Sequence, residues 1–133
     1  MFHMKQGPPS KKEIGALGEN IYVKQIVKHG YNVVEKNYWK KWGEIDIVAE
    51  KKGVLHFIEV KTVGHPLNEV GERYEPEENV HPWKLKRLSR VIQSYLIEEE
   101  IDDEKEWQVD VAAVFLDFER RTAKIRVTFD VGL

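Results

Sequence analysis

The stretch GEIDIVAEKKGVLHFIEVK, residues 43–61, decides the fold. Residues 44–50 and 54–61 are two runs rich in apolar side chains, and the Lys-Lys-Gly between them is typical of a tight turn. Both alternating faces of the second run are mostly apolar, which indicates a strand buried in the middle of a sheet. The sequence therefore predicts a hairpin whose second strand is central.

Asp46, Glu59 and Lys61 bring charge into this apolar hairpin. Pairing of the two strands would place Asp46 beside Glu59, and two such carboxylates repel unless a cation lies between them. Mg²⁺ prefers carboxylate and carbonyl oxygens, so Asp46, Glu59 and the main-chain carbonyl of Val60 are candidate metal ligands. Lys61 shares a face with Glu59 and is placed to orient or deprotonate an attacking water and to offset charge on a phosphate.

A salt-bridge cluster without chemistry is the alternative, because the pattern is short and built from common residues. Its setting on two apolar strands and a further upstream acid, Glu19, favour a functional site. Residues 12–30 show the apolar spacing of a helix, and Glu19 interrupts the apolar stripe. This carboxylate would either be satisfied by a neighbouring donor or act as a further metal ligand or as a residue that orients the metal's water.

The chain from GALGEN (residues 15–20) to IEVKT (residues 58–62) resembles the YraN family of predicted endonucleases, in the PD-(D/E)xK or restriction-endonuclease-like superfamily. In that family a G-x-x-G-E helix, a G-E-I-D strand and a V-E-V-K strand follow one another at this spacing, and the likeness continues more weakly to about residue 116. The resemblance implies that Glu19 is the helix acid, that Asp46 and Glu59 are metal ligands, and that Lys61 is the catalytic lysine.

One position departs from the family pattern. Family members commonly follow the catalytic lysine with Thr and then Arg, whereas here Thr62 is followed by Val63. This change removes a possible phosphate contact.

The resemblance also implies an α/β fold, a restriction-endonuclease-like mixed β-sheet flanked by helices in the order α-β-β-β-α-β-β. Periodicity predicts the elements outside the hairpin: a strand over 31–38, a helix over 81–99, and strands over 107–116 and 124–129. Residues 63–80 lack periodicity, and we interpret them as a long loop that forms a flap beside bound substrate. Asp110, within the strand over 107–116, is expected to be structural.

Lys40 and Lys41 stand between Trp39 and Trp42, next to the predicted site. Lysines mixed with aromatic rings are typical of surfaces on which unpaired bases stack. The alternative is a lysine-rich turn whose tryptophans pack against the sheet. The first interpretation makes the two lysines nucleic-acid contacts.

A second basic cluster occupies the first half of the predicted helix over 81–99. Lys84, Arg87 and Arg90 lie near its N-terminal end, where anions are favoured. These residues are candidate nucleic-acid contacts, and a solvated polar face is the alternative.

The composition suits a single domain over residues 12–133, preceded by a flexible tail over 1–11. The absence of cysteine excludes disulfides, thiolate metal sites and a cysteine nucleophile. The formal net charge is −2, but residues 1–65 contain more lysines than acidic residues. This half of the chain could therefore contact the phosphate backbone of a nucleic acid. The chain contains no long apolar run, so we expect a cytoplasmic protein without a membrane partner.

These features predict an endonuclease dependent on Mg²⁺ or Mn²⁺ that hydrolyses DNA phosphodiester bonds in a structure-sensitive way, by water attack without a covalent intermediate. One alternative is an inactive nuclease-fold module that binds nucleic acid or a protein. Another is a Holliday-junction resolvase, because archaeal resolvases in the superfamily share the order of helix Glu, strand Asp and E-x-K. That activity would require a homodimer.

Overall fold

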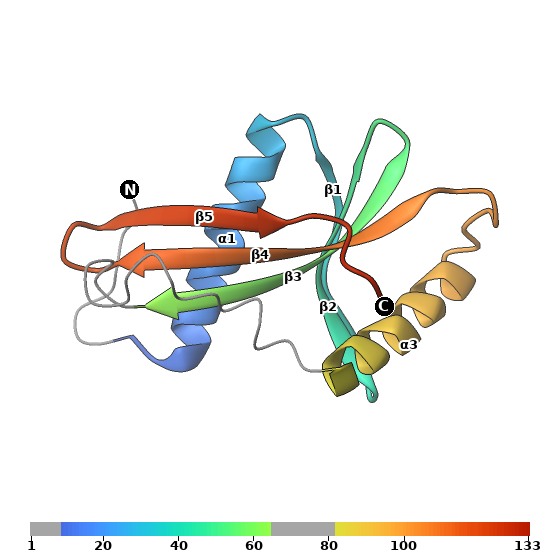
Figure 1. Ribbon diagram of the computed structural model, residues 1–133, viewed down its shortest axis with the longest axis horizontal. Helices are drawn as coiled ribbons and strands as arrows, with labels where there is room; N and C mark the ends of the chain where they lie inside the picture. The colour runs from blue at the N-terminus through green and yellow to red at the C-terminus, as the bar shows by residue number, and fades with distance from the viewer. Residues whose placement is uncertain (1–8, 65–81) are drawn as a thin grey trace.

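A computed structural model describes residues 9–64 and 82–133 and shows a sheet of five strands with two helices (Figure 1). The elements are α1 (Lys11–Lys28), β1 (Asn32–Lys40), β2 (Gly43–Lys51), β3 (Val54–Gly64), α3 (Pro82–Glu98), β4 (Trp107–Asp117) and β5 (Thr122–Thr128). Their order is α-β-β-β-α-β-β, so the predicted α/β fold is confirmed.

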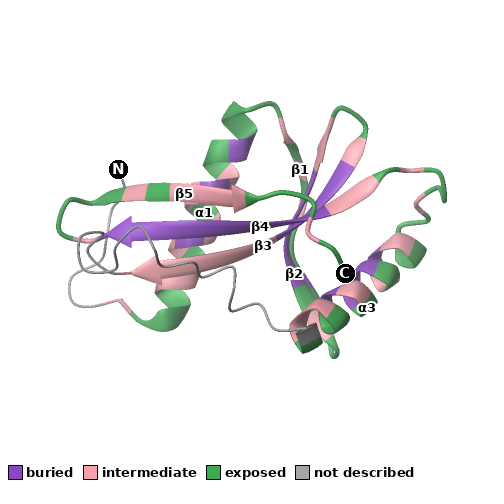
Figure 2. Ribbon diagram, viewed as in Figure 1, coloured by how far each residue is buried: buried purple, intermediate pink, exposed green. Residues whose placement is uncertain are grey.

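The sheet is mixed, with the strands in the order β1-β2-β3-β4-β5. Only β3 and β4 pair in parallel among these strands, and the remaining neighbours pair antiparallel. A parallel pair requires a crossover connection, which here contains α3. β4 is buried along nearly its whole length (Figure 2), as expected for an apolar strand covered on both faces.

The two helices cover opposite faces of the sheet. Tyr22 of α1 packs in a core with Ile58 of β3, whereas Tyr95 of α3 packs in a second core with Phe57, the preceding residue of the same strand. Since successive strand residues point to opposite faces, the sheet separates the two cores. Among the described helices, neither has the length and apolarity needed to cross a bilayer.

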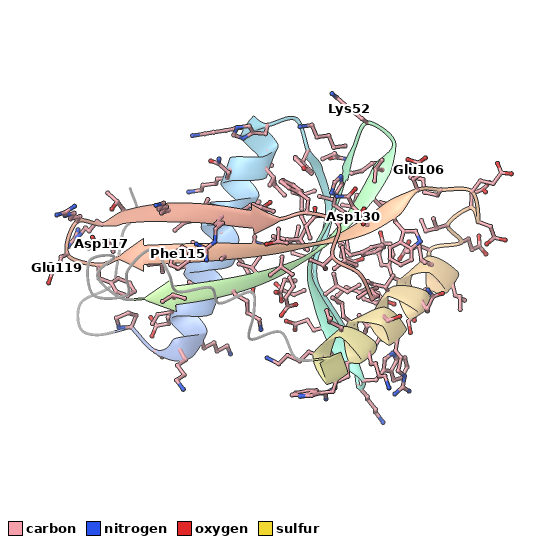
Figure 3. The ribbon with its side chains drawn as sticks, viewed as in Figure 1. Lys52, Glu106, Phe115, Asp117, Glu119 and Asp130 are labelled. Atoms are coloured by element: carbon pink, nitrogen blue, oxygen red, sulfur yellow. The ribbon has the colours of Figure 1, made fainter. Side chains whose placement is uncertain are left out.

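Tight turns fix the register at both ends of the sheet. Lys52 and Gly53 join β2 to β3 with φ angles of 50° and 81°, the left-handed pair that a two-residue hairpin turn requires. At the other end, the Asp117 carboxylate accepts hydrogen bonds of 3.1 Å from the backbone N–H groups of Glu119 and Arg120. Figure 3 labels Lys52 at one turn and Asp117 and Glu119 at the other.

α1 begins one residue before the predicted boundary, at Lys11, because Ser10 caps it. The Ser10 hydroxyl accepts a hydrogen bond from the backbone N–H of Glu13 (3.1 Å), and the Glu13 carboxylate accepts one from the backbone N–H of Ser10 (3.3 Å). This reciprocal pair satisfies two N–H groups at the start of the helix. The rest of the predicted tail, residues 1–8, lies outside the described residues.

The strand that carries the E-x-K motif is longer than predicted. β3 continues to Gly64, because Val63 pairs with Phe115 and Gly64 with Leu116 of β4. Val63 is therefore part of the sheet and not of a loop. The remainder of the predicted flap, residues 65–80, lies outside the described residues.

Candidate active site

Asp46 lies where β2 and β3 separate. The two strands pair from Lys51 and Val54 as far as Ile47 and Ile58, and then diverge (Figure 1). In the resulting fork, Asp46 Oδ2 accepts a 2.8 Å hydrogen bond from the backbone N–H of Val60. A side chain thus takes the role that a main-chain carbonyl plays within the ladder.

The backbone on the other side of Asp46 is also irregular. Asn37 of β1 lies between the partners of Ile45 and Ile47, level with Asp46, and has a φ of 53°. Ile45 packs in the core beneath α3, whereas Ile47 packs in the core beneath α1. Strict alternation would place these two isoleucines on one face. The alternation of side chains between the two faces of the sheet is therefore broken at Asp46.

Acidic side chains from three elements converge on this fork. Asp46 is 8% exposed, and burial, followed by the charge of Glu59, raises the pKa of its carboxyl to about 9. The Val60 N–H opposes this rise, whereas the charge of Glu19 and a hydrogen bond with Glu44 add to it. The structure thus brings together the three predicted acids and adds a fourth, Glu44.

Glu19 reaches the fork from α1 and is held by Asn37. The Asn37 side-chain amide donates a 2.9 Å hydrogen bond to Glu19 Oε1. Burial raises the pKa of Glu19 above its ordinary value, with contributions from Glu44 and Glu59, while the Asn37 bond lowers it. Close approach of α1 to β3 depends on Gly18, because a Cβ there would lie 2.0 Å from the Thr62 hydroxyl oxygen.

Lys61 provides a positive charge beside the acids. Its Nζ lies 3.2 Å from Glu59 Oε1. Burial alone would lower the pKa of Lys61, but the charges of Glu59 and Asp46 and hydrogen bonds outweigh it, so the pKa lies above its ordinary value. The structure therefore places the predicted catalytic lysine next to a predicted metal ligand.

A second lysine arrives from the first turn of α3. The Lys84 amine lies within hydrogen-bonding reach of Lys61, and this contact, together with the charge of Lys61, lowers the pKa of Lys84. The sequence placed Lys84 only among the nucleic-acid contacts. Its position beside Lys61 joins α3 to the acidic fork.

The donor set suits a hard divalent cation. Mg²⁺ is commonly held by one or two carboxylates together with waters, and Asp46 and Glu59 supply two carboxylates. The Val60 N–H points into the fork, and because the N–H and C=O of a strand residue point to the same side, its carbonyl faces the fork as well. Within residues 9–64 and 82–133, no group of three histidine, aspartate or glutamate side chains is arranged to hold a metal ion, so the candidate ligands are the two carboxylates and the Val60 carbonyl.

Two cavities meet at the acid pair. The first, of about 400 Å³, lies between the β1–β2 turn and α3, and the second, of about 550 Å³, lies between α1 and the end of β3. Asp46 and Glu59 line both cavities, whereas Lys61 and Glu19 line only the second. The acid pair is therefore accessible from both cavities.

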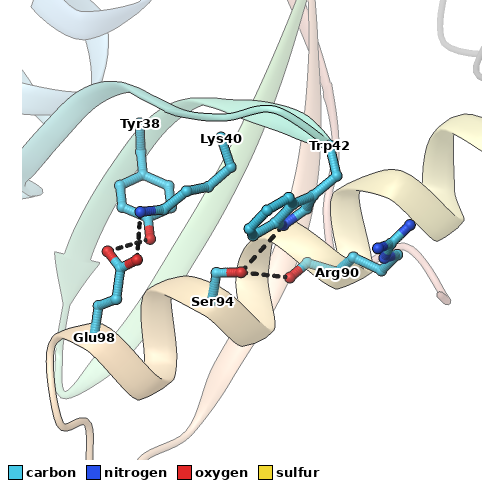
Figure 4. Close-up of polar contacts among 6 residues, drawn as sticks. All are labelled: Tyr38, Lys40, Trp42, Arg90, Ser94 and Glu98. Atoms are coloured by element: carbon cyan, nitrogen blue, oxygen red, sulfur yellow. Dashed lines mark hydrogen bonds and ion pairs between the residues drawn. The ribbon is translucent and has the colours of Figure 1, made fainter.

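The β1–β2 turn is fastened to α3 by three side chains (Figure 4). Glu98 pairs with Lys40 and accepts a 2.8 Å hydrogen bond from the Tyr38 hydroxyl. Trp42 Nε1 donates a 3.1 Å hydrogen bond to the Ser94 hydroxyl. Trp42 therefore packs against the helix. The alternative interpretation, a lysine-rich turn, predicted that it would pack against the sheet.

The two lysines of this turn differ in their surroundings. Lys40 lines the first cavity, but its amine pairs with Glu98. Lys41 lines the same cavity, is exposed, and has no ion pair with another described residue. Of these two candidate nucleic-acid contacts, Lys41 is the one whose charge is available.

The basic residues of α3 also differ in their position relative to the two cavities. Lys84 and Arg87 line the first cavity, and the Arg87 guanidinium lies 5.3 Å from the centre of the Trp83 ring. Arg90 is exposed and lines neither of the two cavities. The structure thus brings Lys84 and Arg87 to the site and leaves Arg90 beside it.

Asp110 lies apart from these cavities, in a buried network. Its carboxylate contacts His56 Nδ1 at 2.7 Å and accepts hydrogen bonds from Gln108 Nε2 (2.8 Å) and from the backbone N–H of Asp130 (3.1 Å). These bonds tie the residues after β5 to the middle of the sheet, which is consistent with the structural role expected for Asp110.

Sequence reasoning missed two residues of the site, Asn37 and Glu44. Glu44 lies two positions before Asp46, on the same side of a strand, and this spacing was a usable signal. Asn37 carried no such signal in one sequence, because its role depends on a left-handed backbone conformation beside a helix that is distant along the chain.

Comparison with known proteins places the chain in a family. The model of the "Uncharacterised protein family UPF0102" matches residues 18–114. A UPF0102 protein of Campylobacter hominis is 33% identical over 102 residues, which are 77% of this chain and 83% of that protein. A UPF0102 protein of Wolinella succinogenes is 39% identical over 87 residues, 65% of this chain and 73% of that protein. The chain therefore belongs to the UPF0102 family, the YraN family to which its motifs pointed.

Proposed function

We propose that this protein is a divalent-metal-dependent endonuclease that hydrolyses phosphodiester bonds in DNA. The observation that carries the proposal is the convergence of Asp46 and Glu59, with Lys61 3.2 Å from Glu59, at the meeting point of two open cavities. Carboxylates alone would repel a phosphodiester. Lysines alone would bind the phosphate without providing a metal site.

Each residue has a distinct part in this proposal. Asp46, Glu59 and the carbonyl of Val60 would hold the cation. When bound, such a cation supplies positive charge that favours ionisation of water and stabilises the charge developing on the phosphate. Lys61 donates hydrogen bonds to a phosphate oxygen, and Glu59 holds its amine in place for that role.

Glu19 and Asn37 act on the position of these groups. The bond from Asn37 fixes the Glu19 carboxylate at the edge of the fork. From there Glu19 can accept a hydrogen bond from a water molecule and orient it. Lys84, beside Lys61, adds a second cation facing the phosphate.

The competing function is a module that binds nucleic acid without cutting it. The buried Asp46 argues against a mere relic, since a carboxylate with a raised pKa and acidic neighbours lowers the stability of the fold at neutral pH unless a cation offsets it. A binding surface has no need of this arrangement.

A side-by-side cleavage assay on single-stranded, duplex, flapped and four-way DNA, with and without Mn²⁺, tests the proposal. We expect cleavage that requires the metal and that falls by about 10²-fold or more in Lys61→Ala. Calorimetric titration with Mn²⁺ should show binding that is lost in Asp46→Ala and Glu59→Ala but kept in Lys61→Ala. Absence of Mn²⁺ binding by the folded protein, or cleavage unchanged in Lys61→Ala, would overturn it.

A further inference from the structure

The first cavity has an aromatic ring at its mouth. Trp39 is 64% exposed, although it belongs to β1, and it lines this cavity. In the β1–β2 register it lies opposite Glu44, whose side chain contacts Asp46. Only Glu44 therefore stands between Trp39 and Asp46. Exposure of so large an apolar surface has no explanation in the core packing.

The opposite wall of the cavity carries positive charge. Lys84 and Arg87 line it from α3, together with Leu88, which is largely buried in the core. Lys41 adds a further charge from the β1–β2 turn. An aromatic ring, several cations and the three acids Glu44, Asp46 and Glu59 make a site for a flat, partly apolar group that carries an anion.

The second cavity differs in chemistry. Among the described residues that line it, none is aromatic. Stacking is therefore available on only one side of the acid pair. A polynucleotide bound across both cavities would meet a stacking surface on one side of the scissile phosphate and a plain groove on the other.

We propose that the first cavity holds one unpaired nucleotide next to the scissile phosphate, with its base stacked on Trp39 and its phosphate bound by Lys84 and Arg87. The inference rests on the proposed function and names its substrate class, DNA in which a single-stranded segment flanks the cleaved bond. Trp39 is then a specificity-determining residue.

Base pairing decides whether this stacking is possible. A base inside a duplex already has neighbours on both faces and must be extruded before it can stack on a side chain, which costs free energy. An unpaired base stacks without that cost, and stacking on one aromatic side chain changes affinity by roughly 5- to 150-fold per base. Trp39 should therefore favour tailed or flapped DNA over blunt duplex.

The test measures binding without chemistry, using the full chain in EDTA. Fluorescein-labelled blunt duplex and the same duplex with an unpaired tail are titrated with wild type, Trp39→Leu, Trp39→Phe and Phe129→Leu. We expect Trp39→Leu to weaken binding of the tailed duplex by about 5-fold or more, to leave the blunt duplex within 2-fold, and Trp39→Phe to keep most of the affinity. Phe129→Leu removes an exposed aromatic ring outside both cavities and should match wild type.

A second readout reports the stack directly. The tail carries 2-aminopurine, whose fluorescence is quenched by stacking, and we expect stronger quenching with wild type than with Trp39→Leu. Equal quenching, or equal loss of affinity for tailed and blunt duplex in Trp39→Leu, would overturn the inference. Selective binding without any cleavage would overturn the proposed function alone, whereas cleavage with the same substrate preference in Trp39→Leu would overturn the inference alone.

Discussion

The backbone N–H of Val60 donates a 2.8 Å hydrogen bond to the carboxylate of Asp46. This bond allows β2 and β3 to separate while the N–H of Val60 keeps an acceptor. The place where the sheet opens is therefore also the place where a carboxylate is buried. Fold and candidate chemistry depend on the same atom pair.

Asp46→Asn should make the metal-free protein more stable. The amide oxygen can still accept the bond from Val60, and an amide does not ionise. Because the pKa of Asp46 is raised to about 9, the folded protein keeps this carboxyl protonated at neutral pH, whereas the unfolded chain ionises it. Wild type therefore loses stability as pH rises from the unfolded pKa towards 9, and the gain from asparagine should be larger at pH 8 than at pH 5. We expect about 1–3 kcal/mol in EDTA near neutral pH, measured by urea unfolding.

Added Mn²⁺ should reverse that ranking, because only wild type retains the ligand. Glu99→Gln, which removes an exposed carboxylate at the end of α3, is the matched control and should change stability little in either condition. If Asp46→Asn is less stable than wild type in EDTA, the carboxyl group of Asp46 stabilises the metal-free fold and the prediction is wrong.

Gly18→Ala should destabilise the protein by about 1–3 kcal/mol, because the new Cβ would lie 2.0 Å from the Thr62 hydroxyl oxygen. Gly15→Ala is the matched control on the same helix, where a Cβ meets nothing within 4 Å, and it should stabilise by roughly 0.5–1 kcal/mol. Thermal unfolding of both variants checks the pair. Equal effects would mean that α1 does not depend on close contact at Gly18.

Two substitutions of Asn37 should separate backbone strain from positioning. Asn37→Ala loses the bond to Glu19 and places alanine at a φ of 53°, which costs roughly 1 kcal/mol, whereas Asn37→Gly loses the bond without that strain. Both variants should lose cleavage activity to a similar extent, but the alanine variant should lose more stability than the glycine variant, by the cost of the strained backbone. If Asn37→Gly cleaves DNA as fast as wild type, Glu19 does not need the hydrogen bond from Asn37 for its role in cleavage.

The basic residues of α3 should differ in their effect on the salt dependence of DNA binding. Lys84→Gln and Arg87→Gln should each lower the slope of log affinity against log salt by about 1, because each removes one phosphate contact. Arg90→Gln, three residues further along the same helix and outside both cavities, should leave the slope unchanged. If the three variants show the same salt dependence, these residues attract DNA through their long-range charge and do not contact individual phosphates.

Much of the fold could be predicted from sequence because its signals are local. The β2–β3 turn needs left-handed residues, and Lys52 and Gly53 supply them. The nearness of Asp46 to Glu59 followed from counting outward from that turn, although the ladder itself ends one pair earlier, at Ile47 and Ile58. Strand ends were less predictable, since β3 reaches Gly64 only because β4, distant along the chain, offers it a partner.

The candidate site was predictable where it depends on one strand and unpredictable where it depends on docking. Lys61 follows Glu59 by two positions, so their shared face could be read directly. The contact of Lys84 with Lys61 depends on where α3 settles, which depends on side chains such as Ser94 and Glu98 at the other end of that helix. One sequence does not encode that placement in any local pattern.

The fastening of Trp42 to Ser94 and of Lys40 to Glu98 has a mechanical result. The strand that presents Trp39 and the helix that presents Arg87 are held together by these contacts. The width of the first cavity is thus set by side chains other than the acids. A shorter or longer side chain at Lys40, Ser94 or Glu98 would narrow or widen the first cavity and so change which groups fit it, while every acidic side chain of the site stayed in place.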